Sequence, residues 1–446
     1  MALRTTMTNT KRILAAFAVF GFCLGDTLSA QTAHTTVRHH KVAEHDSSFP
    51  PELTKAEEAI EKKDYATAEP LLEKVVAAND ANYQAWFDLG FVRNAVGKTD
   101  ESIAAYRKSV AAKPDVFESN LNLGLMLARA GHPDAEQFLR AATKLKPTAQ
   151  IEEGQARAWL SLAHVIENTK PDDAIAAYKE VVRLQPKDPE PHLSAGGLLE
   201  KQGNLDGAEQ EYKQALALDG KSADALTGLV NVYTRGKRYA DAEDLLRKLA
   251  DLYPEDTVAR VQLGRVLAAG GKKNEAIVEL EAAAKQAPND LTVQHDLADL
   301  YAETGKNDLA EARYRALLSG GAKNPELYYA LGKALLLQRK FPEAQQAFLA
   351  AVKLKPDFGA AYGDLGVAAM ENKDYPLAIQ ATDARAKYLP EIPMSYFLRA
   401  TSYDHLRDFQ HASENYHRFL EVANGKYPDQ EWQARHRLIA IEPKKR

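Results

Sequence analysis

The stretch AWFDLGFV, residues 85–92, places a tryptophan, a leucine and a glycine on one apolar helical face. A glycine inside a helix costs about 1 kcal/mol relative to alanine, so its position needs a packing reason. The Leu-Gly pair recurs, and three of the four gaps between successive pairs are 34 residues or twice 34. A fixed period of this kind predicts a repeat architecture. The pairs are Leu89-Gly90, Leu123-Gly124, Leu263-Gly264, Leu331-Gly332 and Leu365-Gly366.

From Phe49 onward the sequence divides into 11 units, and each unit predicts two helices joined by a turn. The second helix of each unit carries a small residue at a fixed position, which would let the two helices approach closely. This residue is Ala68, Ser102, Ala135, Ala174, Ala208, Ala242, Ala276, Ala310, Ala344, Ala378 or Ala412. The units begin near Phe49, Tyr83, Phe117, Ala156, Pro189, Ala223, Thr257, Leu291, Pro325, Gly359 and Pro393.

This pattern resembles the tetratricopeptide repeat, whose signature of about 34 residues combines a large residue, Leu-Gly, Tyr, Ala, an aromatic residue and Pro. The resemblance implies an all-α fold, an α-solenoid of about 11 helix-turn-helix repeats that forms a superhelix and ends in a C-terminal capping helix. We expect the repeat array to span residues 49–426, and the capping helix with a basic tail to span residues 427–446. Trp432, Leu438 and Ile441 are expected to cover the last apolar face.

The third and fourth units depart from the period. Each loses one residue in the turn between its helices, and an insert of roughly residues 148–155 separates them. The insert is therefore a candidate for a change of superhelical pitch or for a hinge.

The N-terminus has the order of a secretory signal peptide: basic residues, the apolar run from Ile13 to Leu24, then small residues up to Ala30. We expect residues 1–30 to be a signal peptide and residues 31–48 to be a flexible polar lead. The apolar run has 12 residues, short of the roughly 20 that span a bilayer, which disfavours the alternative of an uncleaved anchor. The predicted location is periplasmic or secreted, with no transmembrane segment after signal removal.

Composition narrows the function further. Cys23 is the only cysteine and lies in the signal peptide, so the mature chain would have no disulfide, thiol nucleophile or cysteine metal site. The formal charge is −5, and removal of three basic residues and one acidic residue with the signal peptide leaves −7. A mildly acidic chain disfavours nucleic acid as a partner.

The sequence gives no sign of an active site. We find no phosphate-binding loop, no zinc helix and no nucleophile elbow, and the array leaves little chain outside the repeats. His405, His411 and His417 are spaced by six residues, which does not gather them on one helical face. We therefore predict that the protein is not an enzyme, binds no cofactor, and has no catalytic or metal-binding residues.

The resemblance also implies a binding surface, the concave groove that the family lines with the second, fifth, ninth and twelfth residues of each first helix. At these positions the second and third units carry apolar residues, the middle units polar ones and the last three units apolar ones again. Exposed apolar clusters often mark partner surfaces, although burial between adjacent first helices is the alternative. The candidate groove residues are Phe87, Phe91, Leu121, Leu125, Arg157, His164, Asn231, Arg265, His295, Tyr329, Met370, Met394 and Phe397.

Two functions stay open on these grounds. The first is a protein-protein interaction scaffold that binds a peptide or protein segment in the groove, anchored by apolar side chains at one or both ends. The second is a structural component of a cell-envelope complex, such as one for polysaccharide export or outer-membrane assembly. The fold alone names neither the partner nor the pathway.

Overall fold

The computed structural model describes residues 50–319 and 323–442. These residues form helices α2 to α24, without a strand among them, so the prediction of an all-α solenoid is confirmed. The predicted signal peptide and polar lead lie outside the described residues. The chain divides into an N-terminal body, up to Val232, and a C-terminal body, from Tyr233, and the boundary falls inside α12 (Ala223–Arg235). Each body is described by itself.

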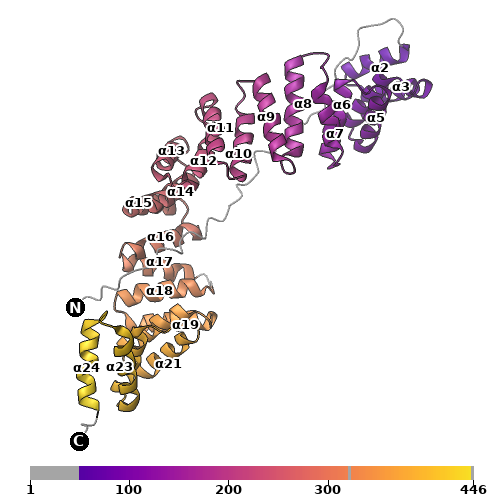
Figure 1. Cartoon of the computed structure of the whole chain (residues 1–446). Helices are drawn as coiled ribbons and strands as arrows, with labels where there is room; N and C mark the ends of the chain where they lie inside the picture. The colour runs from indigo at the N-terminus through magenta and orange to yellow at the C-terminus, as the bar shows by residue number, and fades with distance from the viewer. Residues whose placement is uncertain (1–49, 320–322, 443–446) are drawn as a thin grey trace. The chain divides into compact units, whose positions relative to one another are not determined.

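In the N-terminal body, successive helices pack as antiparallel pairs (Figure 1). The helices that precede α12 are α2 (Pro51–Glu61), α3 (Tyr65–Ala78), α4 (Tyr83–Ala95), α5 (Thr99–Ala112), α6 (Phe117–Arg129), α7 (Ala135–Lys144), α8 (Ile151–Ile166), α9 (Pro171–Leu184), α10 (Glu190–Lys201) and α11 (Leu205–Leu218).

The C-terminal body continues the same arrangement (Figure 1). After α12 its helices are α13 (Tyr239–Leu252), α14 (Thr257–Ala269), α15 (Lys273–Gln286), α16 (Leu291–Glu303), α17 (Asn307–Ser319), α18 (Pro325–Leu337), α19 (Phe341–Leu354), α20 (Gly359–Glu371), α21 (Tyr375–Ala386), α22 (Pro393–His405), α23 (Phe409–Ala423) and α24 (Pro428–Ile441). Within the described residues, no helix is both long and apolar enough to cross a membrane.

Packing explains the recurring Leu-Gly pair. A Cβ added to Gly90 would lie 2.9 Å from the Tyr106 ring, and one added to Gly332 would lie 2.6 Å from the Phe348 ring. Each glycine thus makes room for a large side chain of the second helix. The ten second-helix alanines are at most 1% exposed. Ser102 holds the same position in α5, and its hydroxyl donates a 2.7 Å hydrogen bond to the Gly90 carbonyl.

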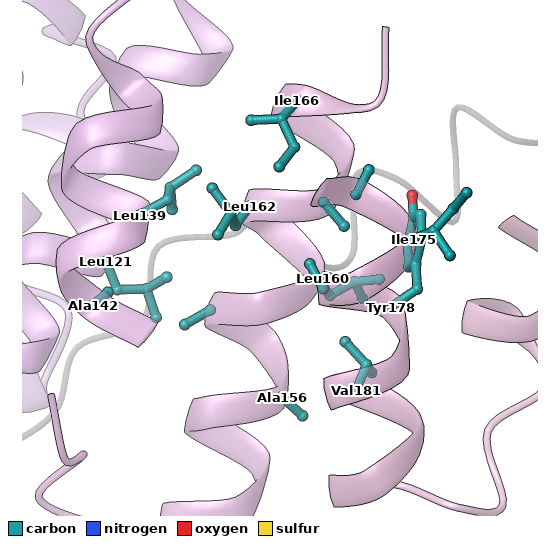
Figure 2. Packing of buried hydrophobic residues seen from close by; sticks show 14 of the residues in the cluster. Leu121, Leu139, Ala142, Ala156, Leu160, Leu162, Ile166, Ile175, Tyr178 and Val181 are labelled. Carbon is teal, nitrogen blue, oxygen red and sulfur yellow. The ribbon is translucent and has the colours of Figure 1, made fainter. Parts of the chain in front are cut away.

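The core of the N-terminal body follows from these contacts. Figure 2 shows Leu121, Leu139, Leu160, Tyr178 and their neighbours, which α6 to α9 bring into one buried apolar cluster. Trp159 packs against the edge of this cluster. The first helix α8 is therefore enclosed by its neighbours.

The insert between the third and fourth repeats is tied to the core. Helix α8 begins at Ile151, so most of the insert forms its first turns. The Glu118 Oε1 atom accepts hydrogen bonds from Thr148 N at 2.8 Å and from Thr148 Oγ1 at 2.7 Å. Glu118 is only 3% exposed, so this carboxylate pins the loop to α6 from a buried position.

The last helix, α24, packs on α23. Ala434 and Leu438 are buried in a cluster with Phe419, and Ile441 packs against it. Trp432 does not, because its side chain is 60% exposed and lies over His436, with the ring centroids 4.0 Å apart. The prediction that Trp432 covers the apolar face is wrong, since helical spacing turns it away from the face of Ala434 and Leu438.

Candidate interaction surfaces

The predicted apolar anchors of the N-terminal body are mostly core residues. Phe87, Leu121 and Leu125 are at most 4% exposed. Phe87 lies edge-on to Tyr106, with the ring centroids 5.7 Å apart. The prediction of exposed anchors is wrong for these three side chains. Phe91 is half-buried, and its ring centroid lies 6.3 Å from that of Tyr65.

The insert accounts for the burial of Leu121. Pro147 and Gly154 lie against Phe117 and Leu121 on α6, around a space of only about 20 Å³. The insert and the early start of α8 cover this face of α6. Position within the repeat therefore does not determine exposure here.

The polar candidates of the N-terminal body differ in exposure. Arg157 is buried at 9% exposed. His164 is half-buried, and its ring lies edge-on to Tyr178 at 5.8 Å. Asn231, at the end of this body, is exposed. Asn231 is thus the polar candidate here that is most accessible to a partner.

In the C-terminal body, polar side chains line consecutive first helices. Arg265 on α14 pairs with Asp296 on α16 at 2.7 Å, and its side chain is 41% exposed. His295 is 44% exposed and lies 3.4 Å from Asp299. Lys333 on α18 is exposed as well. These polar groups therefore stay accessible to solvent after the helices have packed.

Tyr329 connects this polar face to α20. Its ring lies 4.9 Å from that of Phe358, and Lys333 Nζ lies 5.6 Å from the ring centroid. The Tyr329 hydroxyl donates a hydrogen bond to Asp364. Burial raises the pKa of Asp364 above its ordinary value, although this hydrogen bond and Lys333 oppose the shift. Tyr329 is half-buried, so part of its ring stays accessible.

The last apolar candidates belong largely to the C-terminal core. Phe397 is 8% exposed, and its ring lies 5.1 Å from that of Phe419. The prediction that Phe397 is an exposed anchor is wrong, because α23 covers it. Met394 is half-buried against the same cluster, and Met370 is half-buried.

A network of ion pairs between repeats was missed by the sequence prediction. Glu136 on α7 pairs with Arg140 in its own helix and with Lys170 before α9. Glu243 does the same with Arg247 and Lys272. The signal was an acidic residue directly after the small alanine and a basic residue four positions later. Glu311 pairs in the same way with Arg315 and Lys340, and Glu69 pairs with Lys98 although Glu73 stands four positions after it.

A cleft between α15 and α17 was also missed. It has a volume of about 730 Å³ and lies in the C-terminal body, floored by α16. The hydroxyl of Tyr301 donates a 2.6 Å hydrogen bond to Glu281. Burial, with Glu281 nearby, raises the pKa of Tyr301 to about 12. The lining residues are Glu281, Ala284, Lys285, Pro288, Asn289, Leu291, Gln294, Tyr301, Arg313, Ala316 and Leu317.

Two further features bear on the chemistry of these surfaces. The part of the chain that the structure describes holds no group of three or more His, Cys, Asp or Glu side chains placed to bind a metal ion. The three histidines spaced by six are separated, with His411 bound to Asp408 at 2.7 Å and His417 to Glu442 at 2.6 Å.

Family models match most of the repeat array. Residues 95–150, 164–223, 295–343 and 329–393 match a model described as tetratricopeptide repeat. Residues 199–263 and 235–294 match a second model with the same description. Together the matches cover more than half of the chain.

Curated relatives match over parts of their length. Cellulose synthase operon protein C of Xanthomonas axonopodis pv. citri (strain 306) is 31% identical over 220 residues, which are 47% of this chain and 14% of that protein. Protein O-mannosyl-transferase TMTC3 of Homo sapiens is 20% identical over 372 residues, 80% of this chain and 37% of that protein. The chain thus spans a minor part of the length of these relatives.

Solved structures resemble the chain as well. A crystal structure of YrrB, a TPR protein with an unusual peptide-binding site, is 24% identical with a TM-score of 0.38, over 42% of this chain and 96% of that one. The Cut9 and Hcn1 hetero-tetramer of APC/C is 14% identical with a TM-score of 0.35, over 85% of this chain and 95% of that one.

Proposed function

The chain belongs to the tetratricopeptide repeat family, and from this premise we propose that it is a non-enzymatic scaffold that binds a peptide or protein segment on the face of its first helices. Repeats of this family imply protein-protein interaction. The binding face is the concave groove that the family resemblance implies.

One observation supports this proposal above the others, the row of polar, part-exposed side chains on α14, α16 and α18. Arg265, His295 and Lys333 hold the ninth, fifth and ninth positions of their first helices. Arg265 and His295 keep more than 40% of their side-chain surface exposed. Polar side chains that stay exposed after the helices have packed can bind and orient the backbone of a partner.

The experiment is site-specific photo-crosslinking in the native host. A photoreactive phenylalanine derivative replaces Arg265, His295 or Lys333, and matched controls carry it at Val278 on α15 and Leu349 on α19, which are exposed on second helices. We expect a discrete crosslinked protein from the first-helix positions and none from the controls. Equal crosslinking from both sets would contradict the proposal.

A second candidate is a structural component of a cell-envelope complex. It is favoured by the similarity to cellulose synthase operon protein C, a name shared by relatives from Xanthomonas and from Pseudomonas fluorescens (strain SBW25). A stoichiometric complex that resists high salt during purification would favour this candidate. A partner that exchanges with added competitor peptide would favour the scaffold.

Either role fits an exported protein, and we propose export through residues 1–30 as the signal peptide, followed by residues 31–48 as a polar lead. This rests on the order of basic, apolar and small residues in the sequence. Mass spectrometry of the protein from its host is expected to find Gln31 at the N-terminus. Recovery of intact residues 1–30 in the membrane fraction would contradict it.

A further inference from the structure

The cleft between α15 and α17 has the size of a binding site. Its volume of about 730 Å³ lies within the range of about 300–1,000 Å³ that is common for ligand pockets. Leu291 is 68% exposed, while Ala284 and Leu317 are buried among the lining residues. An apolar group in the cleft would therefore bury surface that the chain itself leaves exposed.

At the cleft, the fourth position of the repeat holds Gln294, whereas several other repeats hold an aromatic residue there. Gln294 is the fourth residue of its repeat, and its Nε2 donates to the carbonyl of Pro288, six residues earlier, at 3.1 Å. The indole Nε1 of Trp86, also a fourth residue, donates to the carbonyl of Asp80, again six residues earlier, at 3.0 Å. The two side chains thus make the same local hydrogen bond, and they differ in size. Five repeats hold an aromatic residue at this position, Trp86, Trp159, Tyr328, Tyr362 and Tyr396, and others do not, with Asn120, His192, Leu226 and Arg260.

Charge at the cleft is also left uncompensated. Arg313 Nη1 donates a 2.6 Å hydrogen bond to the Gln294 amide oxygen, which is a neutral partner. Arg313 also hydrogen-bonds to the Tyr301 hydroxyl, and within the described residues no carboxylate lies within 4.0 Å of the charged nitrogens of Arg313 or Lys285. Glu281 is occupied by the Tyr301 hydroxyl. The two cations outnumber the one carboxylate, so the cleft favours an anionic group.

At the preceding junction, between α13 and α15, the positive charges of the arginines are balanced by a carboxylate. Arg260, Glu279 and Arg247 hold the positions that Gln294, Arg313 and Glu281 hold at the cleft, one period later. There Arg260 pairs with Glu279 at 3.5 Å, and Arg247 lies 3.9 Å from the same carboxylate. At the cleft, Gln294 stands where the preceding junction has Arg260, and Arg313 hydrogen-bonds to its amide in place of an ion pair.

We propose that the cleft binds a partner segment by taking one aromatic side chain between α15 and α17, with an adjacent carboxylate held by Lys285 and Arg313. This proposal rests on the scaffold function and names the chemistry of its partner. The ring would contact Leu291, Ala316 and Leu317 and would take the place that an aromatic residue of the chain itself holds in other repeats.

The test is selection of peptides from a phage-displayed library of random twelve-residue segments on the full chain and on three variants. Gln294→Trp refills the cleft, and Trp86 and Trp159 show that this position accepts indole. Lys285→Glu reverses one cation. Lys353→Glu is the matched control, because Lys353 is exposed and lies two periods after Lys285, beside a repeat in which Tyr362 holds the fourth position.

We expect enriched peptides with an aromatic residue next to Asp or Glu. The affinity of these peptides should fall below detection for the Gln294→Trp variant. It should fall roughly fivefold or more for Lys285→Glu and stay unchanged for Lys353→Glu. Circular dichroism melting of each variant verifies that it is folded.

Two results would overturn the proposal. If the peptides bind the Gln294→Trp variant with the same affinity as the parent chain, the cleft is not their binding site. The scaffold function would then still hold, especially if Arg265→Glu or Lys333→Glu abolishes their binding. A library that yields no peptide above background on any of the folded proteins would count against both the cleft and the scaffold function.

Discussion

The first helices α8 and α16 hold the same place in their repeats, yet α8 is enclosed and α16 lies under an open cleft. Trp159 is the fourth residue of its repeat and packs against the buried cluster around Leu160 and Tyr178. Gln294 is the fourth residue of its repeat, and a space of about 730 Å³ adjoins it. The comparison indicates that the side chain at the fourth position contributes to whether a junction between repeats is sealed or open.

The largest effect is expected from emptying the sealed junction. Trp159→Gln removes a half-buried indole and should lower the free energy of unfolding by about 2 kcal/mol, through lost apolar burial and the cavity left behind. Chemical denaturation followed by circular dichroism measures it. Gln155→Ala, on the preceding turn of α8, is the control. A Trp159→Gln variant as stable as the parent would show that this residue does not seal the junction.

A smaller loss is expected where the insert is tied to α6. Thr148→Val removes the hydroxyl that donates to Glu118 Oε1 and leaves that buried carboxylate with one donor fewer. The expected cost is about 1.5 kcal/mol, and limited proteolysis should cut more readily near residue 148. Thr143→Val is a control on α7, because the Thr143 hydroxyl donates only to its own helix. Unchanged proteolysis in Thr148→Val would mean that Glu118 does not hold the insert.

Filling the open junction should have the opposite sign. Gln294→Trp places an aromatic ring against Leu317 and Ala284 and should raise the free energy of unfolding by about 1 kcal/mol. The gain is small because Arg313 loses its amide partner. A fall in stability would indicate that the cleft is narrower than an indole and that overpacking dominates.

The smallest effect concerns the ion pairs between repeats. Hydrogen bonds from Lys170 and then Arg140 hold the pKa of Glu136 below its ordinary value of 4.5. A carboxylate whose folded-state pKa is lowered contributes stability above its unfolded pKa and loses it as the pH falls through the folded value. Glu136→Gln should therefore lower stability by at most about 1 kcal/mol at pH 7, and the difference from the parent should narrow as the pH falls through the folded-state pKa. A difference that does not narrow in acid would assign the effect to packing.

The fold could be predicted from the sequence because its determinants are local and repeated. Gly90 and the second-helix alanines are small where two helices cross, and such a requirement leaves a period in the sequence. The binding face was harder to predict. The insert covers Leu121 and α23 covers Phe397, and neither effect follows from position within a regular repeat. The cleft left no distinctive signal, because Gln294 is one of several residues without an aromatic ring at the fourth position, as are His192, Leu226 and Arg260.

The central claim, that an absent aromatic side chain leaves a site for a ring with a carboxylate, can be tested most directly by NMR. The methyl groups of Leu291 and Leu317 are observed in the full chain and in Gln294→Trp during titration with indole-3-acetate, the smallest probe that carries both groups. The account predicts that the methyl resonances of the parent chain shift with saturation, and that those of Gln294→Trp do not. Equal shifts in both proteins, or none in the parent chain, would contradict it.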